Sequence, residues 1–211
     1  MILLGLTGPI ACGKTTVLQM LEYRGAKSID SDQLVHELMA PGLPVWEGIV
    51  ATFGPDNLLP DQTINRKRLG ETVFGDQKAM HRLERIIHPA VVEEIESRLQ
   101  SWEQRNTGRQ QETVAVLEAI KLIEGGYHTR CHAVWIVTCD SDVQIRRLVK
   151  TRALTEEEAR LRLRSQPGWS EKMRFADLII HNNGSRKDLE RQVEQAWRQL
   201  LGREVRNDEN S

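Results

Sequence analysis

One short segment constrains this chain more than any other. Residues Gly8 to Thr15 read Gly-Pro-Ile-Ala-Cys-Gly-Lys-Thr and fit the pattern G-x-x-x-x-G-K-[ST]. An apolar run, Ile2 to Leu6, comes directly before the segment, and a helix-like stretch, Lys14 to Tyr23, overlaps its end. The segment is therefore predicted to be a phosphate-binding loop between a buried strand and a helix.

The residue types of this loop suit the binding of a nucleotide. Glycines let successive backbone N–H groups come close to phosphate oxygens, and the partial positive end of the following helix points at the same place. Lys14 is predicted to neutralise charge on the β- and γ-phosphates, and Thr15 to give its hydroxyl to Mg²⁺. The predicted nucleotide-binding residues are Gly8, Ala11, Cys12, Gly13, Lys14, Thr15 and Thr16. The alternative is an ordinary glycine-rich turn with an exposed lysine. Such a turn does not require Gly, Lys and Thr in this order and spacing.

The cysteines offer little sign of metal binding or of disulfides. The chain has three, Cys12, Cys131 and Cys139, without a C-x-x-C pair. An odd, scattered set is typical of a reducing compartment. Cys12 occupies a variable position of the loop pattern; a thiol at a helix N-terminus can have a lowered pKa, and simple packing is the alternative.

Short apolar runs alternate with longer amphipathic ones along the chain. The runs are nearly continuous in apolar residues, as in strands that are covered on both faces, and we expect five strands and nine helices. This alternation predicts an α/β fold with a doubly wound, parallel five-stranded sheet in three α/β/α layers. The expected strands are Ile2–Leu6, Ala26–Ile29, Thr113–Leu117, Ala133–Thr138 and Leu178–His181, and the expected helices are Lys14–Tyr23, Asp32–Met39, Val45–Phe53, Lys67–Phe74, Gln77–Glu84, Ala90–Gln104, Ser141–Arg152, Thr155–Ser165 and Lys187–Leu201.

The second and third expected strands are separated by a stretch too long for one crossover. Residues 41–107 are predicted to form a helical insertion that covers the acceptor substrate. Residues 1–40 and 108–211 are predicted to form the nucleotide-binding core.

Two carboxylates end the second expected strand, in the sequence Ile29-Asp30-Ser31-Asp32. Ligands of open α/β sheets bind at the carboxyl ends of strands, so Asp30 and Asp32 are expected beside the loop. A carboxylate there can take the proton of an attacking alcohol, and the pair can also hold Mg²⁺ through water. The alternative is that Asp32 or Ser31 caps the next helix.

Composition excludes several other classes of function. The net charge is −1 with 28% charged residues, so no basic excess indicates a nucleic-acid partner. No run of about 18 apolar residues is present, and the N-terminus lacks the features of a signal peptide, so we expect a cytoplasmic enzyme. The Asn-Lys-x-Asp segment with which GTP-binding switches read guanine is also absent, which favours transfer of a phosphoryl group to a small acceptor.

Further segments, in order along the chain, make the sequence similar to one known family. They include Phe53-Gly54-Pro55, Leu59-Pro60-Asp61, Asn65-Arg66 ahead of Val73-Phe74, His88-Pro89, Gln144, Arg147, Gln166 and Asn182-Asn183-Gly184. Together with the loop and the Asp30–Asp32 segment, they resemble the dephospho-coenzyme A kinases. The resemblance implies Mg²⁺-dependent transfer from ATP to the ribose 3′-hydroxyl of dephospho-coenzyme A, the last step of coenzyme A synthesis. It also implies a mobile lid, placed at 150–170.

The resemblance assigns roles to particular residues. Asp32 would be the proton acceptor, with Asp30 next to metal and ribose. Arg66 and His88 would lie on the acceptor side, although a histidine at a helix boundary is the alternative for His88. Arg147 would spread over the charge of the γ-phosphoryl group, unless it belongs to a solvated helix face.

Three more assignments concern the ends of later strands. Asn182 and Asn183 would contact adenine, with a simple turn as the alternative. Glu118 stands at the end of the third expected strand, where it can hold metal-bound water. It is counted among the predicted substrate-binding residues.

The sequence departs from the family in two places. The segment Glu118 to Glu124 lacks the family's proline, and Thr151 stands where the family has a lid arginine, with Arg152 one position later. Arg152, Arg162 and Arg164 remain alternatives for the lid charge.

The rival functions are a nucleoside or nucleotide kinase, a nucleotide-binding switch, and a member without activity. The expected form is a monomer with ATP and dephospho-coenzyme A as its small-molecule substrates.

Overall fold

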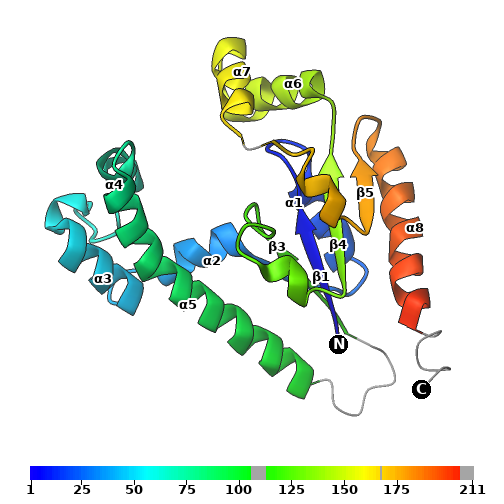
Figure 1. The fold of residues 1–211 in the computed structure, drawn as a ribbon, viewed down its shortest axis with the longest axis horizontal. Coiled ribbons are helices and arrows are strands. Elements are labelled where there is room, and N and C mark those ends of the chain that lie inside the picture. The colour runs from blue at the N-terminus through cyan, green and yellow to red at the C-terminus, as the bar shows by residue number, and fades with distance from the viewer. Residues whose placement is uncertain (106–112, 167, 205–211) are drawn as a thin grey trace. The chain divides into compact units, whose positions relative to one another are not determined.

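A computed structural model describes residues 1–105, 113–166 and 168–204 (Figure 1). The chain divides into two compact units, one comprising Met1–Ser28 with Gly108–Ser211 and the other Ile29–Thr107. We call them the nucleotide unit and the helical unit.

The nucleotide unit is built on parallel strands. β1 (Ile2–Thr7) runs parallel to both β3 (Val114–Glu118) and β4 (Ala133–Thr138), and β4 runs parallel to β5 (Leu178–His181). With β2 (Lys27–Asp30), at which the two units join, the sheet has the order β2-β3-β1-β4-β5. The predicted α/β fold with a five-stranded parallel sheet is confirmed. Parallel pairing brings the carboxyl ends of β1, β3 and β4 to one edge of the sheet.

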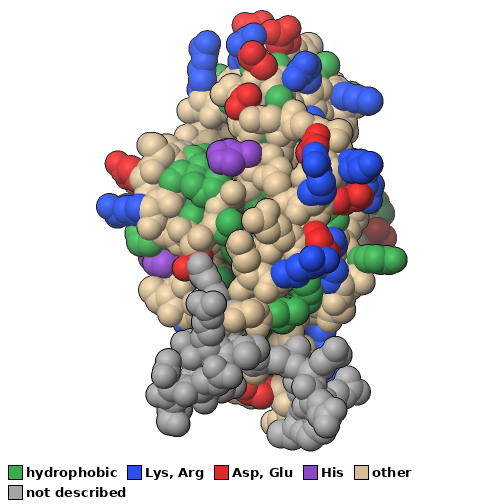
Figure 2. Space-filling view, turned by 90° about the vertical axis from the view of Figure 1, so that its right-hand side faces the viewer, with side chains coloured by type: hydrophobic (Ala, Val, Ile, Leu, Met, Phe, Trp, Pro, Cys, Tyr) green, Lys and Arg blue, Asp and Glu red, His purple; other side chains and the backbone are tan. Residues whose placement is uncertain are grey.

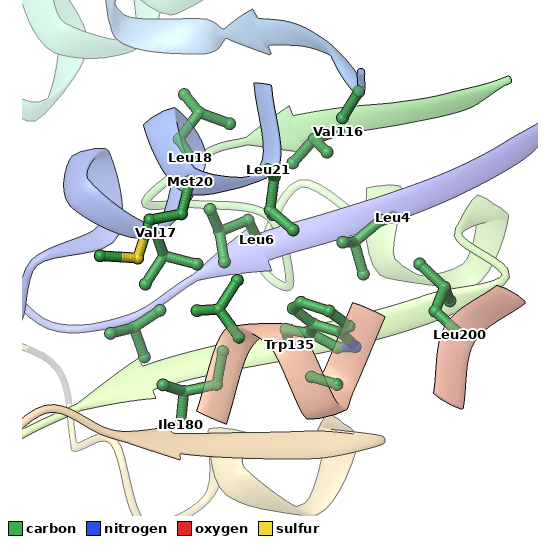
Figure 3. Close-up of a cluster of buried hydrophobic side chains, with 14 of the residues drawn as sticks. Leu4, Leu6, Val17, Leu18, Met20, Leu21, Val116, Trp135, Ile180 and Leu200 are labelled. Atoms are coloured by element: carbon green, nitrogen blue, oxygen red, sulfur yellow. The ribbon is translucent and has the colours of Figure 1, made fainter. Parts of the chain in front are cut away.

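Two helices cover one face of this sheet. α1 (Lys14–Glu22) and α8 (Arg186–Glu204) pack on β1, β3, β4 and β5 through a buried apolar cluster. Figure 3 shows side chains of this cluster converging from both helices and from the strands. The indole of Trp135 is among them and is 3% exposed, so this tryptophan stabilises the core. The labelled members are Leu4, Leu6, Val17, Leu18, Met20, Leu21, Val116, Trp135, Ile180 and Leu200.

A helix pair follows β4. α6 (Ser141–Arg152) packs against α7 (Glu156–Arg164) through Ile145, Leu148 and Ala159, and Ile10 and Ala11 of the loop join this cluster. Thr155 and Glu158 form a reciprocal capping box at the start of α7. The helix predicted over Thr155–Ser165 is confirmed, with Thr155 as its N-cap. The pair therefore lies directly on the phosphate loop.

Short 3₁₀ helices complete the nucleotide unit at Tyr127–Arg130 and Lys172–Phe175. The turn before the first of them carries Leu122, which is 1% exposed. A Cβ added at Gly5 of β1 would lie 2.7 Å from Cδ2 of Leu122. Close packing on Gly5 therefore anchors the segment from Glu118 to Glu124, although it lacks the proline of the related family.

The helical unit consists of α2 (Ser31–Leu38), α3 (Pro44–Phe53), α4 (Arg66–Val73) and α5 (Gln77–Gln104), with a 3₁₀ turn at Pro55–Asn57. Its apolar side chains form a separate core. Burial of each large aliphatic side chain in such a core stabilises the fold by about 1.5–3 kcal/mol. The buried members are Met39, Val45, Ile49, Ile64, Leu69, Val73 and Ala79.

The prediction of two helices, Gln77–Glu84 and Ala90–Gln104, is wrong: α5 is continuous through Pro89. Proline removes one helical hydrogen bond and usually ends or bends a helix. Here the apolar spacing continues across it, since Leu83, Ile86 and Ala90 all pack on the core of the helical unit. The packing of this face outweighs the local preference of proline.

The other predicted elements lie within three residues of the observed bounds. None of the helices within the described ranges has the length and the apolar content needed to cross a membrane. Figure 2 shows the face that carries α8 and the helix pair α6–α7, where basic and acidic side chains intermingle. On α8, Arg186 pairs with Glu190 and Arg191 with Asp188.

Candidate active site

The loop between β1 and α1 has a backbone that only glycine fits at two positions. Gly8 has φ +151°, and a Cβ there would lie 2.1 Å from the carbonyl oxygen of Val137 in β4. Gly13 has φ +92° and is the N-cap of α1, which has no side-chain cap among the described residues. The first N–H groups of α1 are therefore left to bind an anion, as the sequence pattern predicts.

The ammonium group of Lys14 lies inside the loop. It donates to the carbonyl oxygens of Gly8 at 3.0 Å and Pro9 at 3.3 Å. Its Nζ is 3.9 Å from Oε1 of Glu118, and the two side chains are only 10% and 7% exposed. A buried cation and a buried carboxylate thus meet at the carboxyl edge of the sheet, where their mutual attraction is weakly screened by water.

Arg147 and Asn182 hold the far side of the loop. The amide of Asn182, which is 6% exposed, donates to the carbonyl oxygen of Cys12 at 2.8 Å. The guanidinium of Arg147 donates to the carbonyl oxygens of Ala11 at 3.3 Å and Asn182 at 3.0 Å. Arg147 is therefore not part of a solvated helix face.

Two glutamines fix the tip of the loop at Ile10. Gln144 of α6 donates to the carbonyl oxygen of Ile10 at 2.7 Å, and Gln166 accepts from its N–H at 2.9 Å. Neither glutamine is predicted from the sequence to have a function of its own. The only signal for a role was that both glutamines are among the residues on which the family resemblance rests. Nothing in the sequence around them distinguishes them from surface glutamines.

Asn183 differs from its neighbour because it is exposed. Its side chain forms a reciprocal contact with Asp140, accepting from the backbone N–H at 2.7 Å and donating to Oδ1 at 3.0 Å. Asp140 is the N-cap of α6. Asn183 therefore ties the end of β5 to the start of this helix, and its contact with adenine stays a prediction.

Cys12 lies next to a second cysteine, a contact that the sequence does not predict. Its Sγ is 3.1 Å from Sγ of Cys139, the residue after β4. The hydrogen bond with Cys139, together with burial, raises the pKa of Cys12 far above its usual value. The same hydrogen bond, helped by the charge of Arg147, lowers the pKa of Cys139. The idea that Cys12 has a lowered pKa is wrong; the shift belongs to its neighbour.

In the helical unit, Asp30 and Asp32 stand at the start of α2. Asp30 is the N-cap, and its Oδ1 accepts from the backbone N–H groups of Asp32 at 2.9 Å and Gln33 at 3.0 Å. The alternative that Ser31 or Asp32 is the cap is therefore wrong. Capping by Asp30 directs Asp32 into the first turn, where its side chain is exposed.

The helical unit also brings Arg66 next to a histidine that was not singled out. His36 lies four positions after Asp32 on α2, and its Nε2 is 2.7 Å from Nη1 of Arg66. Residues four apart share one face of a helix, so the spacing of Asp32 and His36 was the available signal.

His88 lies inside α5 and is exposed. No hydrogen bond joins His88 to Arg66 among the described interactions, so these two predicted residues are not brought together directly.

The three candidate lid arginines, Arg152, Arg162 and Arg164, are all exposed. Arg152 is the last residue of α6 and Arg164 the last of α7. None of them has a hydrogen bond to the loop in the described part of the chain, so Arg147 is the arginine that contacts it.

A parallel sheet that carries this loop, with Lys14 buried at its carboxyl edge, defines a P-loop nucleotide-binding protein. The comparisons with known proteins agree with this class. A family model described as dephospho-CoA kinase matches residues 2–188, and the chain belongs to this family.

Relatives and solved structures give the same result. The chain is 40% identical to the dephospho-CoA kinase of Syntrophus aciditrophicus over 97% of this chain and 85% of the relative. It is 44% identical to that of Geobacter sulfurreducens, over 92% and 96%. The structure of dephospho-CoA kinase from Campylobacter jejuni has a TM-score of 0.70 and 28% identity, over 95% of this chain and 97% of that one.

The enzyme class and the reaction predicted from the sequence are confirmed at the level of the family. The chain is a kinase of coenzyme A biosynthesis, and neither another small-acceptor kinase nor a nucleotide-binding switch is favoured.

Proposed function

We propose that the loop holds the phosphates of ATP and that Asp32 accepts the proton of the attacking 3′-hydroxyl of dephospho-coenzyme A. The observation that supports the donor side best is the position of Lys14, buried among loop carbonyls and Glu118. A fixed cation at this place favours charge that develops between the β- and γ-phosphates, and it costs little reorganisation during the reaction.

The acceptor side rests on the helical unit. Residues 41–107 are the proposed acceptor-binding insertion, and Arg66 and His88 are the proposed contacts to the acceptor's phosphates. His36 joins them because its Nε2 lies 2.7 Å from the guanidinium of Arg66 and fixes the orientation of that group. Asp30, whose Oδ1 is engaged in capping α2, serves the ribose or metal-bound water with its second oxygen.

The adenine end of ATP is assigned to Asn182 and Asn183. Asn182 acts chiefly through the backbone of the loop, because its amide is bonded to Cys12. Arg147 has contacts to both the loop and the end of β5, so it is placed to stabilise charge on the transferred group. Residues 150–170 are the proposed lid, whose closure excludes water during transfer.

Magnesium fits the oxygen donors of the nucleotide unit. Among the described residues, no three His, Cys, Asp or Glu side chains gather to hold a metal ion by themselves. Mg²⁺ commonly binds through one or two protein oxygens together with substrate phosphates, and the hydroxyl of Thr15 and the carboxylate of Glu118 are of this type. When bound, Mg²⁺ neutralises charge on the phosphates.

The proposed reaction transfers the γ-phosphoryl group of ATP to the 3′-hydroxyl of the acceptor. The 3′-oxygen bonds to the γ-phosphorus, the bond from that phosphorus to the β,γ-bridging oxygen breaks, and ADP leaves. The hydroxyl proton goes to the carboxylate of Asp32. Asp32 is exposed on α2, where a substrate can reach it.

We also propose a monomer that acts in the cytoplasm without a nucleic-acid or membrane partner. The near-neutral net charge of −1 supports the part of this proposal that concerns nucleic acid, because nucleic-acid binding favours a basic excess. So does the face in Figure 2, where basic side chains are interspersed with acidic ones rather than gathered in one patch.

The substitution Asp32→Asn tests the assignment. Turnover with Mg²⁺·ATP and dephospho-coenzyme A, followed by ADP and coenzyme A together, should fall by about 10² or more, because the amide cannot accept the proton. The affinity for ATP, measured by calorimetry, should remain nearly unchanged. A comparable loss of ATP affinity would make Asp32 a metal or structural residue.

Glu37→Gln is the matched control. It also converts a carboxylate to an amide on α2, but Glu37 pairs with Arg98 and has no proposed part in the reaction. Its turnover should stay within about twofold of the wild type. Thymidine as a second acceptor completes the assay, and equal ADP formation with thymidine would contradict the proposed acceptor.

A further inference from the structure

The phosphoryl transfer proposed above makes no use of the Cys12 sulfur. Cys12 lies in the middle of the phosphate loop, and its side chain points to the residue after β4. The two sulfur atoms of Cys12 and Cys139 are 3.1 Å apart, although the residues are far apart in the sequence. Two thiols in contact at a nucleotide-binding loop form a site with its own chemistry.

The surroundings give the two sulfurs different roles. Cys139 is half-buried, and Nη1 of Arg147 lies 3.7 Å from its Sγ. A guanidinium at this distance favours the thiolate, the form of cysteine that reacts with oxidants. Cys12 is 0% exposed, so a reagent reaches Cys139 first and Cys12 is positioned as the second thiol.

We propose that Cys12 and Cys139 form a reversible disulfide that weakens nucleotide binding, with a peroxide as the oxidant. The Cys139 thiolate attacks one oxygen of hydrogen peroxide, and the O–O bond breaks to give a sulfenic acid and hydroxide. The Cys12 thiol then attacks the sulfenic sulfur, the S–O bond breaks, and the thiol proton passes to the departing hydroxide, which leaves as water. Overall, two thiols are oxidised, one peroxide is reduced, and two water molecules form.

The bond requires the loop to move. A disulfide has an S–S distance of about 2.0 Å, so the sulfurs must approach each other by about 1 Å. Cys12 lies between Ala11 at φ +59° and Gly13 at φ +92°, and its carbonyl accepts from Asn182. A pull on this residue therefore reorients the backbone N–H groups on both sides of it, and a shift of this size is enough to weaken phosphate binding by about tenfold or more.

Thermodynamic linkage gives a second consequence. If the disulfide lowers the affinity for ATP by some factor, saturating ATP must favour the dithiol by the same factor. ATP should therefore protect the cysteine pair from oxidation in an equilibrium with a dithiol–disulfide buffer.

The full-length protein with and without hydrogen peroxide tests the proposal. Mass spectrometry of digested protein should find Cys12 joined to Cys139, and calorimetry should show ATP affinity lower by about tenfold or more. Dithiothreitol should restore the affinity. The inference rests on ATP binding by the loop, so failure of the reduced protein to bind ATP would contradict the proposed donor site instead.

Three variants separate the pair from general oxidation. Cys131→Ser should respond to peroxide like the wild type, because burial raises the pKa of Cys131 to about 11 and disfavours its thiolate. Cys139→Ser and Cys12→Ala should each have the same ATP affinity before and after peroxide. Loss of affinity after peroxide in both of these variants, absence of the linked peptide from the wild type, or a linked wild type with unchanged affinity would each overturn the proposal.

Discussion

The two units of this enzyme hold their proposed functional residues in opposite ways. In the nucleotide unit, Lys14 and Glu118 are almost fully buried, and the loop backbone is bonded to the side chains of Asn182, just after β5, and Gln144 of α6. In the helical unit, Asp32, Arg66 and His88 are all exposed, and the described contacts around them are short-range caps and one pair with His36. One site is fixed by the core, and the other is carried on helix surfaces.

This difference fits the two kinds of ligand. A phosphate group is small and highly charged, so its binding gains from donors that are already in place before it arrives. A large acceptor meets exposed side chains that can adjust to it. We therefore expect substitutions in the nucleotide unit to change stability and ATP binding together, and substitutions on the surface of the helical unit to affect stability little.

The largest effect is expected for Gly8→Ala. The new Cβ would lie 2.1 Å from the Val137 carbonyl oxygen, which is backbone of a central strand and cannot turn away. We expect a loss of roughly 2–4 kcal/mol in the free energy of unfolding and a loss of ATP affinity greater than about 10². Urea unfolding and calorimetry measure the two quantities.

Gly25→Ala is the control for backbone strain alone. Gly25 also has a left-handed φ, +93°, but nothing lies within 4 Å of its added Cβ. It should cost about 1 kcal/mol and leave ATP affinity unchanged. If Gly8→Ala costs no more than Gly25→Ala, the loop is less rigid than its contacts imply.

An intermediate effect is expected for Glu118→Gln. The proposed role of this buried carboxylate is to hold metal-bound water, and loss of such a group typically costs about tenfold or more in metal affinity. Calorimetry should show about tenfold weaker binding of ATP with Mg²⁺ and no weakening without it, because Lys14 loses a competing negative charge.

Glu124→Gln is the matched control in the same segment. Glu124 pairs with Lys172 rather than with the loop, so both affinities should stay within about twofold of the wild type. If Glu118→Gln changes the affinity for ATP equally with and without Mg²⁺, Glu118 serves only as the partner of Lys14.

The contrast between the units also explains what the sequence could predict. The loop and the strands depend on local signals, namely glycines in register and continuous apolar runs, and the bounds of β4 and β5 were predicted correctly. Asp30 as the helix cap was missed because Asp30, Ser31 and Asp32 are all good caps, and only the backbone path selects one of them.

Contacts between distant segments were harder to predict. Cys139 meets Cys12, and Gln144 meets Ile10, because parallel pairing brings the ends of β1 and β4 together. No periodicity within one segment carries that information. The continuity of α5 through Pro89 was missed for a similar reason, since the tertiary packing of Ile86 and Ala90 decides it.

The smallest effect is expected for Glu37→Gln in the helical unit. The hydrogen bond from Arg98, 2.8 Å long, lowers the pKa of Glu37, although both side chains are partly exposed, at 34% and 44%. A lowered pKa stabilises the fold above the ordinary carboxyl pKa, and this contribution disappears as the pH falls through the folded value.

Screening by water limits the pair to roughly 0.5 kcal/mol, so Glu37→Gln should unfold at slightly lower urea than the wild type at pH 7. As the pH falls below the ordinary carboxyl pKa of about 4.3, the difference between the two proteins should shrink, because the wild-type carboxylate becomes protonated and loses its attraction to Arg98. Two outcomes would contradict this expectation: a difference in the free energy of unfolding that persists in acid, or one above about 2 kcal/mol at pH 7. Either would show that more than exposed ion pairs stabilises this surface. The contrast between the two units would then be smaller than their exposure implies.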